Sequence, residues 1–309
     1  MRMYIAGING MVGSAIAIEA KSQGYDVIGK SSTDLDLTDR KSVFDEMNRF
    51  NPDTLIIAAA KVGGIGANSN LPVDFLSINL QIQTNLLDAA HHAEIERVLF
   101  LGSSCIYPRL APQPILESSL LTGQLEPTNE PYAIAKIAGL KLVEAYRRQF
   151  GHSWISAMPT NLYGPRDNFN VETAHVLPAL LHRFHIAKLI GAQNVDIWGD
   201  GSPLREFLHV EDLARACLIL LSSYDEATPI NIGYGQEISI RDLAQLISNV
   251  VGFEGDITFN SSMPNGTPRK FLDSTRIKKL GWEPQHSLTT GIATTYDWFV
   301  ANNQEGSSL

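Results

Sequence analysis

The stretch MYIAGINGMVGSAIAIEAKSQG, residues 3–24, decides the fold of this chain of 309 residues. Residues 3–7 form the near-continuous apolar run of a strand buried on both faces, and residues 14–24 have the apolar spacing of a helix. Between them, Gly7, Gly10 and Gly13 permit a tight turn, close approach of the backbone to a pyrophosphate and close packing of helix on sheet. Strand, glycine-rich turn and helix in this order predict a dinucleotide bound by its phosphates at the helix N-terminus.

The same alternation of strand and helix continues through the first half of the chain. Further strand-like runs lie at residues 26–30, 54–60, 98–104 and 153–160. Helical patterns lie at residues 40–50, 79–93 and 131–150. Such alternation predicts an α/β fold with a doubly wound parallel sheet of the Rossmann type.

The second half of the chain predicts a smaller domain. After residue 164 the pattern breaks into loops rich in Pro and Gly, mixed with short helices such as 176–189. We expect residues 1–163 to form the dinucleotide-binding domain, and 164–309 to form mainly a mixed α/β substrate-binding domain. Residues 206–223 look helical and 229–235 resemble a buried strand, so the segment near 206–235 is expected to return to the sheet.

The composition argues against several classes of protein. A net charge of -9 and a pI near 5.4 speak against a surface for nucleic acid or anionic membranes. Two cysteines, Cys105 and Cys217, are too few for a disulfide framework and fit a reducing compartment. No leader is visible at the N-terminus, and no apolar run reaches the length of about 18 residues that spans a membrane. We therefore expect a cytoplasmic protein with neither nucleic acid nor membrane as a partner.

Tyr132 and Lys136 are the first candidate catalytic pair. They lie four apart in a helical pattern, so their side chains share one face of the helix. A free tyrosine keeps its proton to about pH 10, and a neighbouring ammonium favours the phenolate. The spacing therefore predicts that Lys136 lowers the pKa of Tyr132 and makes the phenol usable in proton transfer to or from a sugar hydroxyl or ketone.

The strand-like run at 98–104 supplies the next candidates. It ends in Ser103 and Ser104, with Cys105 directly after them, at the carboxyl edge of the sheet, where doubly wound folds bind ligands. Ser103 precedes Tyr132 by 29 residues, and a hydroxyl there suits the polarisation of a ketone. No CxxC or HExxH spacing is present, so we expect no metal.

The end of the second strand bears on the choice of cofactor. A site selective for NAD usually carries Asp or Glu there, to hold the ribose 2'-hydroxyl. This chain has Lys30, Ser31 and Ser32, with no carboxylate until Asp34. A cation suits a 2'-phosphate, so the sequence favours NADP(H).

Several longer motifs resemble one family closely. The GxxGxxG turn, LGSSCIYP (101–108) and YxxxK are similar to the extended short-chain dehydrogenases/reductases that act on nucleotide sugars. The resemblance narrows to the GDP-sugar epimerase-reductases through AAAKVGGI (58–65), EPTNEPYAIAKIAG (126–139), MPTNLYGPRDNF (158–169), REFLHVED (205–212) and NGTPRK (265–270). It runs over essentially the whole chain. It implies NADPH-dependent 3,5-epimerisation and 4-reduction of GDP-4-keto-6-deoxy-D-mannose to GDP-L-fucose.

The resemblance also implies roles for individual residues. Ser103 hydrogen-bonds the reacting oxygen, Tyr132 transfers a proton, and Lys136 lowers the tyrosine pKa and holds the nicotinamide ribose. Cys105 and His175 form the acid/base pair that inverts C3 and C5, and both side chains titrate within reach of neutral pH. A buried structural cysteine and a surface histidine at a helix start remain the alternatives for these two.

Binding residues and a homodimer are implied in the same way. Candidate cofactor contacts are Gly7, Asn9, Gly10, Met11, Val12, Gly13, Lys30, Leu101, Gly102, Ser103, Ser104, Lys136, Pro159, Thr160, Asn161, Leu162 and His175. Candidate substrate contacts are Arg183, Trp198, Arg205 and Asn265. A guanidinium fork matches phosphate oxygens, and an indole offers a stacking surface, so these types suit a GDP-sugar.

Two departures from the family pattern leave alternatives open. Asn9 stands where the family usually has an Arg that helps to bind the 2'-phosphate, and Asn265 stands where Asp is common. A related GDP-sugar epimerase-reductase, such as one that forms GDP-L-colitose, is therefore one alternative. A redox-neutral nucleotide-sugar epimerase that retains NAD is a second, and a regulatory dinucleotide-binding module without catalysis is a third.

Overall fold

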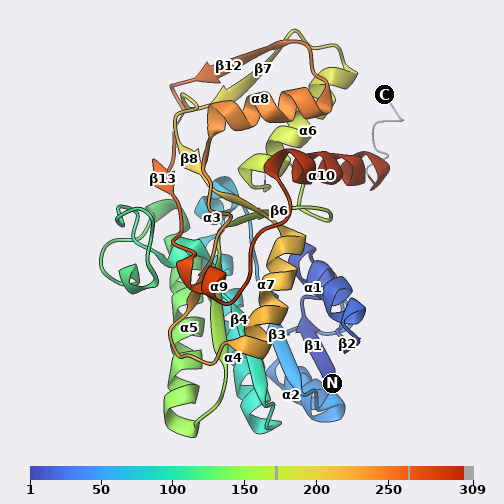
Figure 1. Cartoon of the computed structure of the whole chain (residues 1–309), viewed down its shortest axis with the longest axis vertical. Helices are drawn as coiled ribbons and strands as arrows, with labels where there is room; N and C mark the ends of the chain where they lie inside the picture. Colours follow the sequence, from blue (N-terminus) through green and yellow to red (C-terminus); the bar gives the residue numbers. More distant parts are fainter. Residues whose placement is uncertain (171–172, 264, 303–309) are drawn as a thin grey trace.

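A six-stranded parallel sheet forms the centre of the computed structural model, which describes residues 1–170, 173–263 and 265–302 (Figure 1). The strand order is β10-β5-β4-β3-β1-β2. The strands are β1 Arg2–Ala6, β2 Asp26–Ile28, β3 Thr54–Ile57, β4 Arg97–Leu101, β5 Ile155–Pro159 and β10 Ile230–Ile232. The doubly wound parallel sheet predicted from the sequence is thus confirmed.

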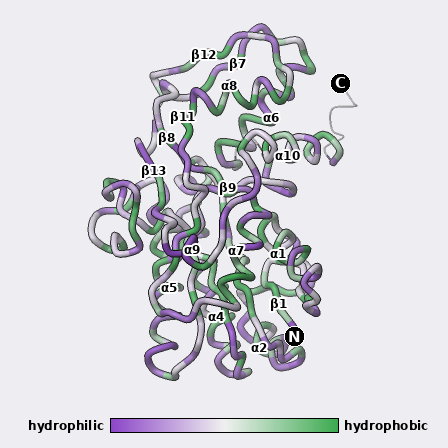
Figure 2. Tube along the Cα trace, in the orientation of Figure 1, coloured by the Kyte–Doolittle hydropathy of each residue, from purple (hydrophilic) through white to green (hydrophobic). Residues whose placement is uncertain are grey.

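Helices cover both faces of this sheet. The helices that cover the two faces are α1 Met11–Ser22, α2 Arg40–Phe50, α4 Pro72–His92, α5 Glu130–Phe150 and α7 Val210–Ser223. Alternate strand residues enter two cores, because Met3 and Ile5 pack with α1 and α7, whereas Tyr4 and Ala6 pack with α2, α4 and α5. Figure 2 shows hydrophobic positions gathered in this sheet, with hydrophilic loops around it.

The glycine turn lies where the strand order reverses, between β1 and β3. Gly7 has a φ of 87°, and a Cβ added at Gly13 would stand 2.1 Å from the Gly7 carbonyl oxygen. Gly10 is the N-cap of α1, and its lack of a side chain leaves the first backbone N–H groups of the helix without a side-chain cap. The turn therefore presents free donors at the edge of the sheet where ligands of this fold bind.

A second layer of elements stands beyond the carboxyl edge of the sheet (Figure 1). Its core joins α6 Val176–Leu189, α8 Ile240–Val251 and α10 Leu288–Asn302 with the pair β7 Asn194–Trp198 and β12 Asp256–Asn260. Short strands connect the two layers: β6 Asn161–Tyr163 with β9 Phe207–His209, and β8 Leu204–Arg205 between β11 Ile238–Ser239 and β13 Arg269–Lys270. Shorter helices are α3 Ile65–Asn70, α9 Thr275–Lys279 and the 3-10 turns η1 Ser104–Ile106, η2 Glu117–Ser119 and η3 Pro127–Asn129.

The segment near 206–235 crosses between the layers. β10 extends the central sheet beside β5, and α7 packs on the face that α1 also covers. The expected helix at 206–223 begins only at Val210, because residues 207–209 pair with β6 as β9. His209 ends the strand and caps the helix, since its side chain accepts a hydrogen bond from the Glu211 N–H.

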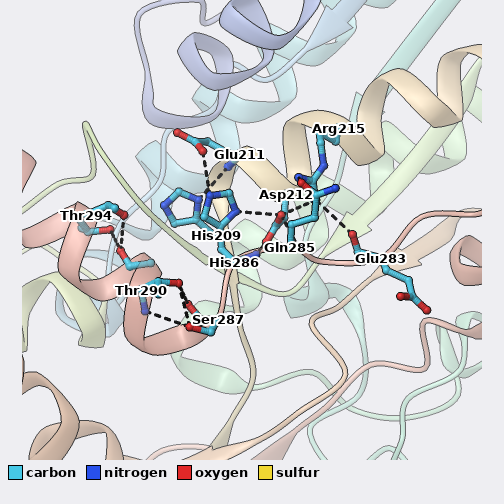
Figure 3. A network of polar contacts seen from close by, with 12 residues as sticks. His209, Glu211, Asp212, Arg215, Glu283, Gln285, His286, Ser287, Thr290 and Thr294 are labelled. Atoms are coloured by element: carbon cyan, nitrogen blue, oxygen red, sulfur yellow. Dashed lines mark hydrogen bonds and ion pairs between the residues drawn. The ribbon is translucent and has the colours of Figure 1, made fainter.

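A polar network anchors the start of α7 to the C-terminal segment (Figure 3). Asp212 is fully buried and accepts hydrogen bonds from Arg215, from the backbone of Gln285 and from the His286 ring at 3.1 Å. His286 lies 3.1 Å from the Glu211 carboxylate and stacks on His209 with ring centroids 4.2 Å apart. His209, Glu211 and His286 have the donor types of a metal site, but their contacts make them a cap and a brace for α7.

Among the described helices, none is both long and apolar enough to cross a membrane.

Gly13→Ala tests the close approach of helix and turn. The added methyl group would overlap the Gly7 carbonyl oxygen, so we expect unfolding free energy to fall by about 3 kcal/mol or more in urea titrations. Gly10→Ala is the matched control, because its Cβ would lie 3.4 Å from the same oxygen. Equal losses for the two variants would contradict this reading of the turn.

His209 predicts an acid-sensitive fold. Burial, aided by His286 and opposed by Asp212, lowers the pKa of His209 to about 4, whereas an unfolded histidine titrates near pH 6.5. Between these values only the unfolded chain holds the proton, so the contribution of His209 is complete above about pH 6.5 and lost as the pH falls towards 4. We expect His209→Asn, which keeps a capping oxygen, to remove about 3 kcal/mol of the pH dependence of unfolding.

Urea titrations at pH 7, 6, 5 and 4 measure this slope. His92→Asn is the control, because His92 is exposed on α4. A His209→Asn variant with the slope of the parent protein would rule out His209 as the acid-sensitive group.

Candidate active site

Lys136 joins α5 to the end of β4. Its side chain is buried, and Nζ donates a hydrogen bond to the carbonyl oxygen of Leu101 at 2.8 Å. The ammonium also lies 5.0 Å from the Phe100 ring centroid and 5.9 Å from that of Tyr132. Burial lowers the pKa of Lys136 to about 8, so the side chain is mostly charged at neutral pH.

Tyr132 lies one turn before Lys136, half-buried beside Phe75 and hydrogen-bonded to Ser103. The prediction that Lys136 lowers its pKa is wrong for this structure. Burial, aided by the nearby Cys105 sulfur, raises the pKa of Tyr132 above its ordinary value, and the hydrogen bond from Ser103 only partly opposes the rise. Lys136 directs its ammonium at a backbone carbonyl instead, so the phenol keeps its proton at neutral pH.

Ser103 and Cys105 turn into the same space at the end of β4. Ser103 caps the short turn η1, and its Oγ accepts a hydrogen bond from the Cys105 N–H at 3.2 Å. The Cys105 sulfur accepts from Asn129 Nδ2 at 3.3 Å and from Lys270 Nζ at 3.4 Å. Thiol, hydroxyl and phenol therefore meet at one point, with two donors directed at the sulfur.

His175 approaches this group from the other layer. It is the N-cap residue of α6, and its side chain makes no capping hydrogen bond and stays accessible. Crowding by the surrounding protein lowers the pKa of His175, and the positive charge of Lys270 adds to this effect. Lys270 thus contacts Cys105 and also lies near enough to His175 to lower its pKa.

Strand pairing brings Arg205 beside Lys270. The two residues are partners in the parallel pair β8–β13. Burial lowers the pKa of Arg205, and Glu126 and Cys105 lie close enough to oppose this shift. The guanidinium of Arg205 donates to its neighbour's carbonyl oxygen at 2.8 Å. Within the described residues Arg205 has no carboxylate in salt-bridge contact, so its charge is available to an anion.

The remaining predicted substrate contacts lie farther out in the second layer. Arg183 of α6 donates to the Asp196 carbonyl oxygen of β7 at 2.7 Å, and Trp198 ends β7 with 60% of its surface exposed. Asn265 accepts from the Asp200 N–H at 2.9 Å and so holds the turn after Trp198. No described contact joins Arg183 or Trp198 to Cys105 or Tyr132.

The predicted cofactor residues line the carboxyl ends of β1, β4 and β5. Gly102 lies so close to Met158 that an added Cβ would stand 2.4 Å from its sulfur. Ser104 is buried, and Met11, Val12 and Leu162 pack against the core on the α1 face. Asn9 is exposed on the turn, and Pro159 ends β5.

Two of these residues have structural contacts that the sequence did not indicate. The side chains of Thr160 and Asn161 both donate to the Glu206 carbonyl oxygen, at 3.3 and 2.8 Å. The fully buried Glu206 carboxylate accepts from the backbone of Gly235 and Leu272, so it ties three loops around the site. Glu206 therefore orients both of these side chains.

Lys30 lies two residues after β2, half-buried, and makes no ion pair within the described part of the chain. The first carboxylate beyond it, Asp34, accepts a hydrogen bond from Ser31 at 2.6 Å. Lys30 is thus a cation without an ion-pair partner in the described part of the chain, close to the end of β2.

Sequence reasoning missed Lys270 and Asn129. Both belong to motifs that it singled out, NGTPRK and EPTNEPYAIAKIAG. Lys270 is 165 residues from the cysteine that it contacts, so no local spacing relates them. Asn129 precedes a helix, where an amide is expected as a cap, and only the structure shows that it turns to Cys105 instead.

Comparison with known proteins places this site in a family. Residues 3–233 match the NAD dependent epimerase/dehydratase family. GDP-L-fucose synthase 1 of Arabidopsis thaliana is 54% identical over 97% of this chain and 94% of its own length. GDP-L-fucose synthase of Escherichia coli is 50% identical over 97% of each chain, and GDP-L-colitose synthase of Yersinia pseudotuberculosis is 38% identical over 97% and 98%.

Solved structures agree with the sequence relatives. A GDP-mannoheptose C4 reductase from Campylobacter jejuni with NADP bound has a TM-score of 0.89 at 32% identity and covers 97% of this chain and 98% of its own. The resemblance expected from the motifs is confirmed: the chain belongs to the NAD dependent epimerase/dehydratase family, in the branch that contains the GDP-L-fucose synthases.

Proposed function

We propose that this enzyme converts GDP-4-keto-6-deoxy-D-mannose to GDP-L-fucose with NADPH, by epimerising C3 and C5 and then reducing the C4 ketone. The observation that carries the proposal is the meeting of two sets of groups at the end of β4. Ser103, Tyr132 and Lys136 suit reduction of a ketone, and Cys105 beside Lys270 suits removal of a proton from carbon. The names and high identity of the plant and bacterial relatives support it.

The turn at α1 fits a dinucleotide. The first N–H groups of α1 have no side-chain cap and its first turn has no acidic residue, so this helix end suits phosphates. Because Gly13 and Gly7 carry no side chains, helix and turn pack closely and no side chain of either residue stands between the backbone and a phosphate. Lys30 suits a 2'-phosphate, which supports NADP(H). When bound, NADPH supplies the hydride that reduces C4.

Tyr132 is the proton donor of the reduction in this scheme. Its raised pKa keeps the phenol protonated at neutral pH, as an acid must be when the C4 oxygen becomes an alkoxide. Ser103 hydrogen-bonds Tyr132 and lies within reach of the same oxygen. Lys136 Nζ lies 5.9 Å from the Tyr132 ring centroid and donates to the Leu101 carbonyl oxygen, so it holds α5 and its phenol at the end of β4.

Cys105 and His175 perform the epimerisation. Inversion requires that a proton leave carbon on one face and return on the other, so acid and base must come from different sides. Cys105 projects from the end of the sheet and His175 from the N-terminus of α6 in the opposite layer. The C4 ketone makes the protons on C3 and C5 acidic, so both inversions precede reduction.

The second layer is proposed to bind GDP. Arg205 has a charge available for the diphosphate, and Arg183 and Trp198 offer a guanidinium and an exposed ring farther out. Asn265 shapes the turn beside Trp198 without a charge of its own. The lower identity to the colitose synthase supports GDP-L-fucose as the product.

The division into domains, the homodimer and the cytoplasmic location stay proposals. We assign residues 1–163, with the segment near 206–235, to dinucleotide binding and most of 164–309 to the substrate. α4 and α5 carry exposed apolar side chains, among them Val73, Ile134 and Phe150, which supports association of two copies. Sedimentation equilibrium against the 33.9 kDa of one chain tests the dimer, and cell fractionation tests the compartment.

Tyr132→Phe and Cys105→Ser separate the two halves of the reaction. With GDP-4-keto-6-deoxy-D-mannose in deuterated water, we expect Tyr132→Phe to slow NADPH oxidation about 10²–10⁴-fold while C3 and C5 still exchange. We expect Cys105→Ser to slow the exchange by a similar factor. NMR of the sugar and absorbance at 340 nm measure the two processes. Full exchange in Cys105→Ser, or full turnover in Tyr132→Phe, would refute the roles assigned here.

Lys30→Ser tests the basis of cofactor choice. Loss of one charge-assisted hydrogen bond to a 2'-phosphate should weaken NADPH binding about tenfold and leave NADH binding unchanged. Fluorescence titration of both nucleotides measures this, with Lys21→Ala on the exposed side of α1 as the control. Equal effects on the two nucleotides would show that Lys30 does not read the phosphate.

A further inference from the structure

Asn129 is half-buried, and its amide oxygen has no hydrogen-bond partner among the described residues. It stands at the N-cap of α5, yet its side chain does not cap the helix. Nδ2 donates to the Cys105 sulfur at 3.3 Å, whereas Oδ1 is buried and has no hydrogen-bond partner among the described residues. Asparagine at this position usually caps the helix with its side chain. The Asn129 side chain contacts Cys105 instead, which indicates a role other than capping.

The unpaired oxygen is the significant part of this arrangement. A buried acceptor without a partner destabilises a protein by about 1–3 kcal/mol, and such groups are rare outside functional sites. The contact with the sulfur orients the amide, because the sulfur accepts a hydrogen bond from the NH2 group at 3.3 Å. Oδ1 belongs to the same amide group, and no donor among the described residues reaches it.

The chemistry at Cys105 indicates which donor this is. The function proposed above brings C3 and C5 in turn to the sulfur, with reacting atoms about 3–3.5 Å apart. C5 carries a methyl group and the ring oxygen, so only C3 carries a hydroxyl. When C3 contacts the Cys105 sulfur, the 3-hydroxyl oxygen is one bond from that carbon. It is then within reach of the Asn129 amide, which contacts the same sulfur.

We propose that Asn129 is a specificity-determining residue whose Oδ1 accepts the 3-hydroxyl of the substrate while its Nδ2 positions the Cys105 sulfur. This inference rests on the proposed function. It makes Asn129 the residue that distinguishes GDP-4-ketosugars with a 3-hydroxyl from 3-deoxy sugars. A 3-deoxy sugar would leave the buried oxygen unpaired, and sites built to hydrogen-bond a hydroxyl discriminate strongly against analogues that lack it.

The test compares two substrates and two variants. The substrates are GDP-4-keto-6-deoxy-D-mannose and GDP-4-keto-3,6-dideoxy-D-mannose. The turnover of each is measured by the oxidation of NADPH. We expect the ratio of their kcat/KM values to favour the hydroxylated sugar in the parent protein, and to fall at least tenfold in Asn129→Leu. Asn129→Asp keeps the acceptor and should keep the preference. It also serves as the second variant if the leucine variant does not fold.

A second readout needs no sugar. Iodoacetamide labels accessible thiolates, and the chain has only two cysteines. Cys217 is fully buried, and burial raises its pKa to about 12, so it serves as an unreactive internal reference. Loss of the Nδ2 donor should slow labelling of Cys105 severalfold at pH 7.5 in both variants, as read from peptide masses.

The outcomes separate the inference from the function on which it rests. If the parent protein turns over the hydroxylated sugar and Asn129→Leu leaves the substrate ratio unchanged, the role of Oδ1 is overturned and the function stands. Unchanged labelling of Cys105 in both variants overturns the role of Nδ2. If the parent protein oxidises no NADPH with either sugar, the proposed function fails and the specificity role fails with it.

Discussion

The buried ammonium of Lys136 fixes the geometry of this site. Its hydrogen bond to the last carbonyl of β4 holds α5 against the strand that carries Ser103 and Cys105. Close packing reinforces it, since a Cβ at Gly139 of α5 would stand 2.5 Å from the Phe100 ring. A buried charge is stable only when it is paired or hydrogen-bonded, so the position of α5 against β4 has little freedom. The phenol, hydroxyl and thiol of the site take their places from this contact.

The second layer completes the site through strand pairing. β8 and β13 place Arg205 and Lys270 side by side, and Lys270 reaches across to the cysteine at the end of the sheet. Glu206, adjacent to Arg205, binds the backbone of Gly235 and Leu272 and the side chain of Asn161, and it keeps this layer in register with β5 and β10. A chemical division follows: the sheet carries the groups for the ketone, and the second layer adds the charges and the imidazole for the carbon protons.

The fold was largely predictable because its signals are local. Gly7, Gly10 and Gly13 follow an apolar strand, and helix and strand periods alternate up to β5. The start of α7 was misjudged, since residues 207–209 form a strand through pairing with distant β6. Within the site, residue types and spacing indicated Ser103, Tyr132 and Lys136. The sign of the tyrosine pKa shift was wrong because burial, which spacing does not reveal, raises this pKa, while Lys136 is directed at the Leu101 carbonyl oxygen. Lys270 and Asn129 depend on tertiary contacts alone.

The central claim is that one site exchanges two carbon-bound protons with water and then reduces the ketone between them. The most direct measurement is the isotope pattern of the product formed by the unaltered protein in deuterated water with unlabelled NADPH. The account predicts GDP-L-fucose with deuterium at C3 and C5 and protium at C4, read by NMR. A product that carries protium at C3 and C5, or deuterium at C4, would contradict it.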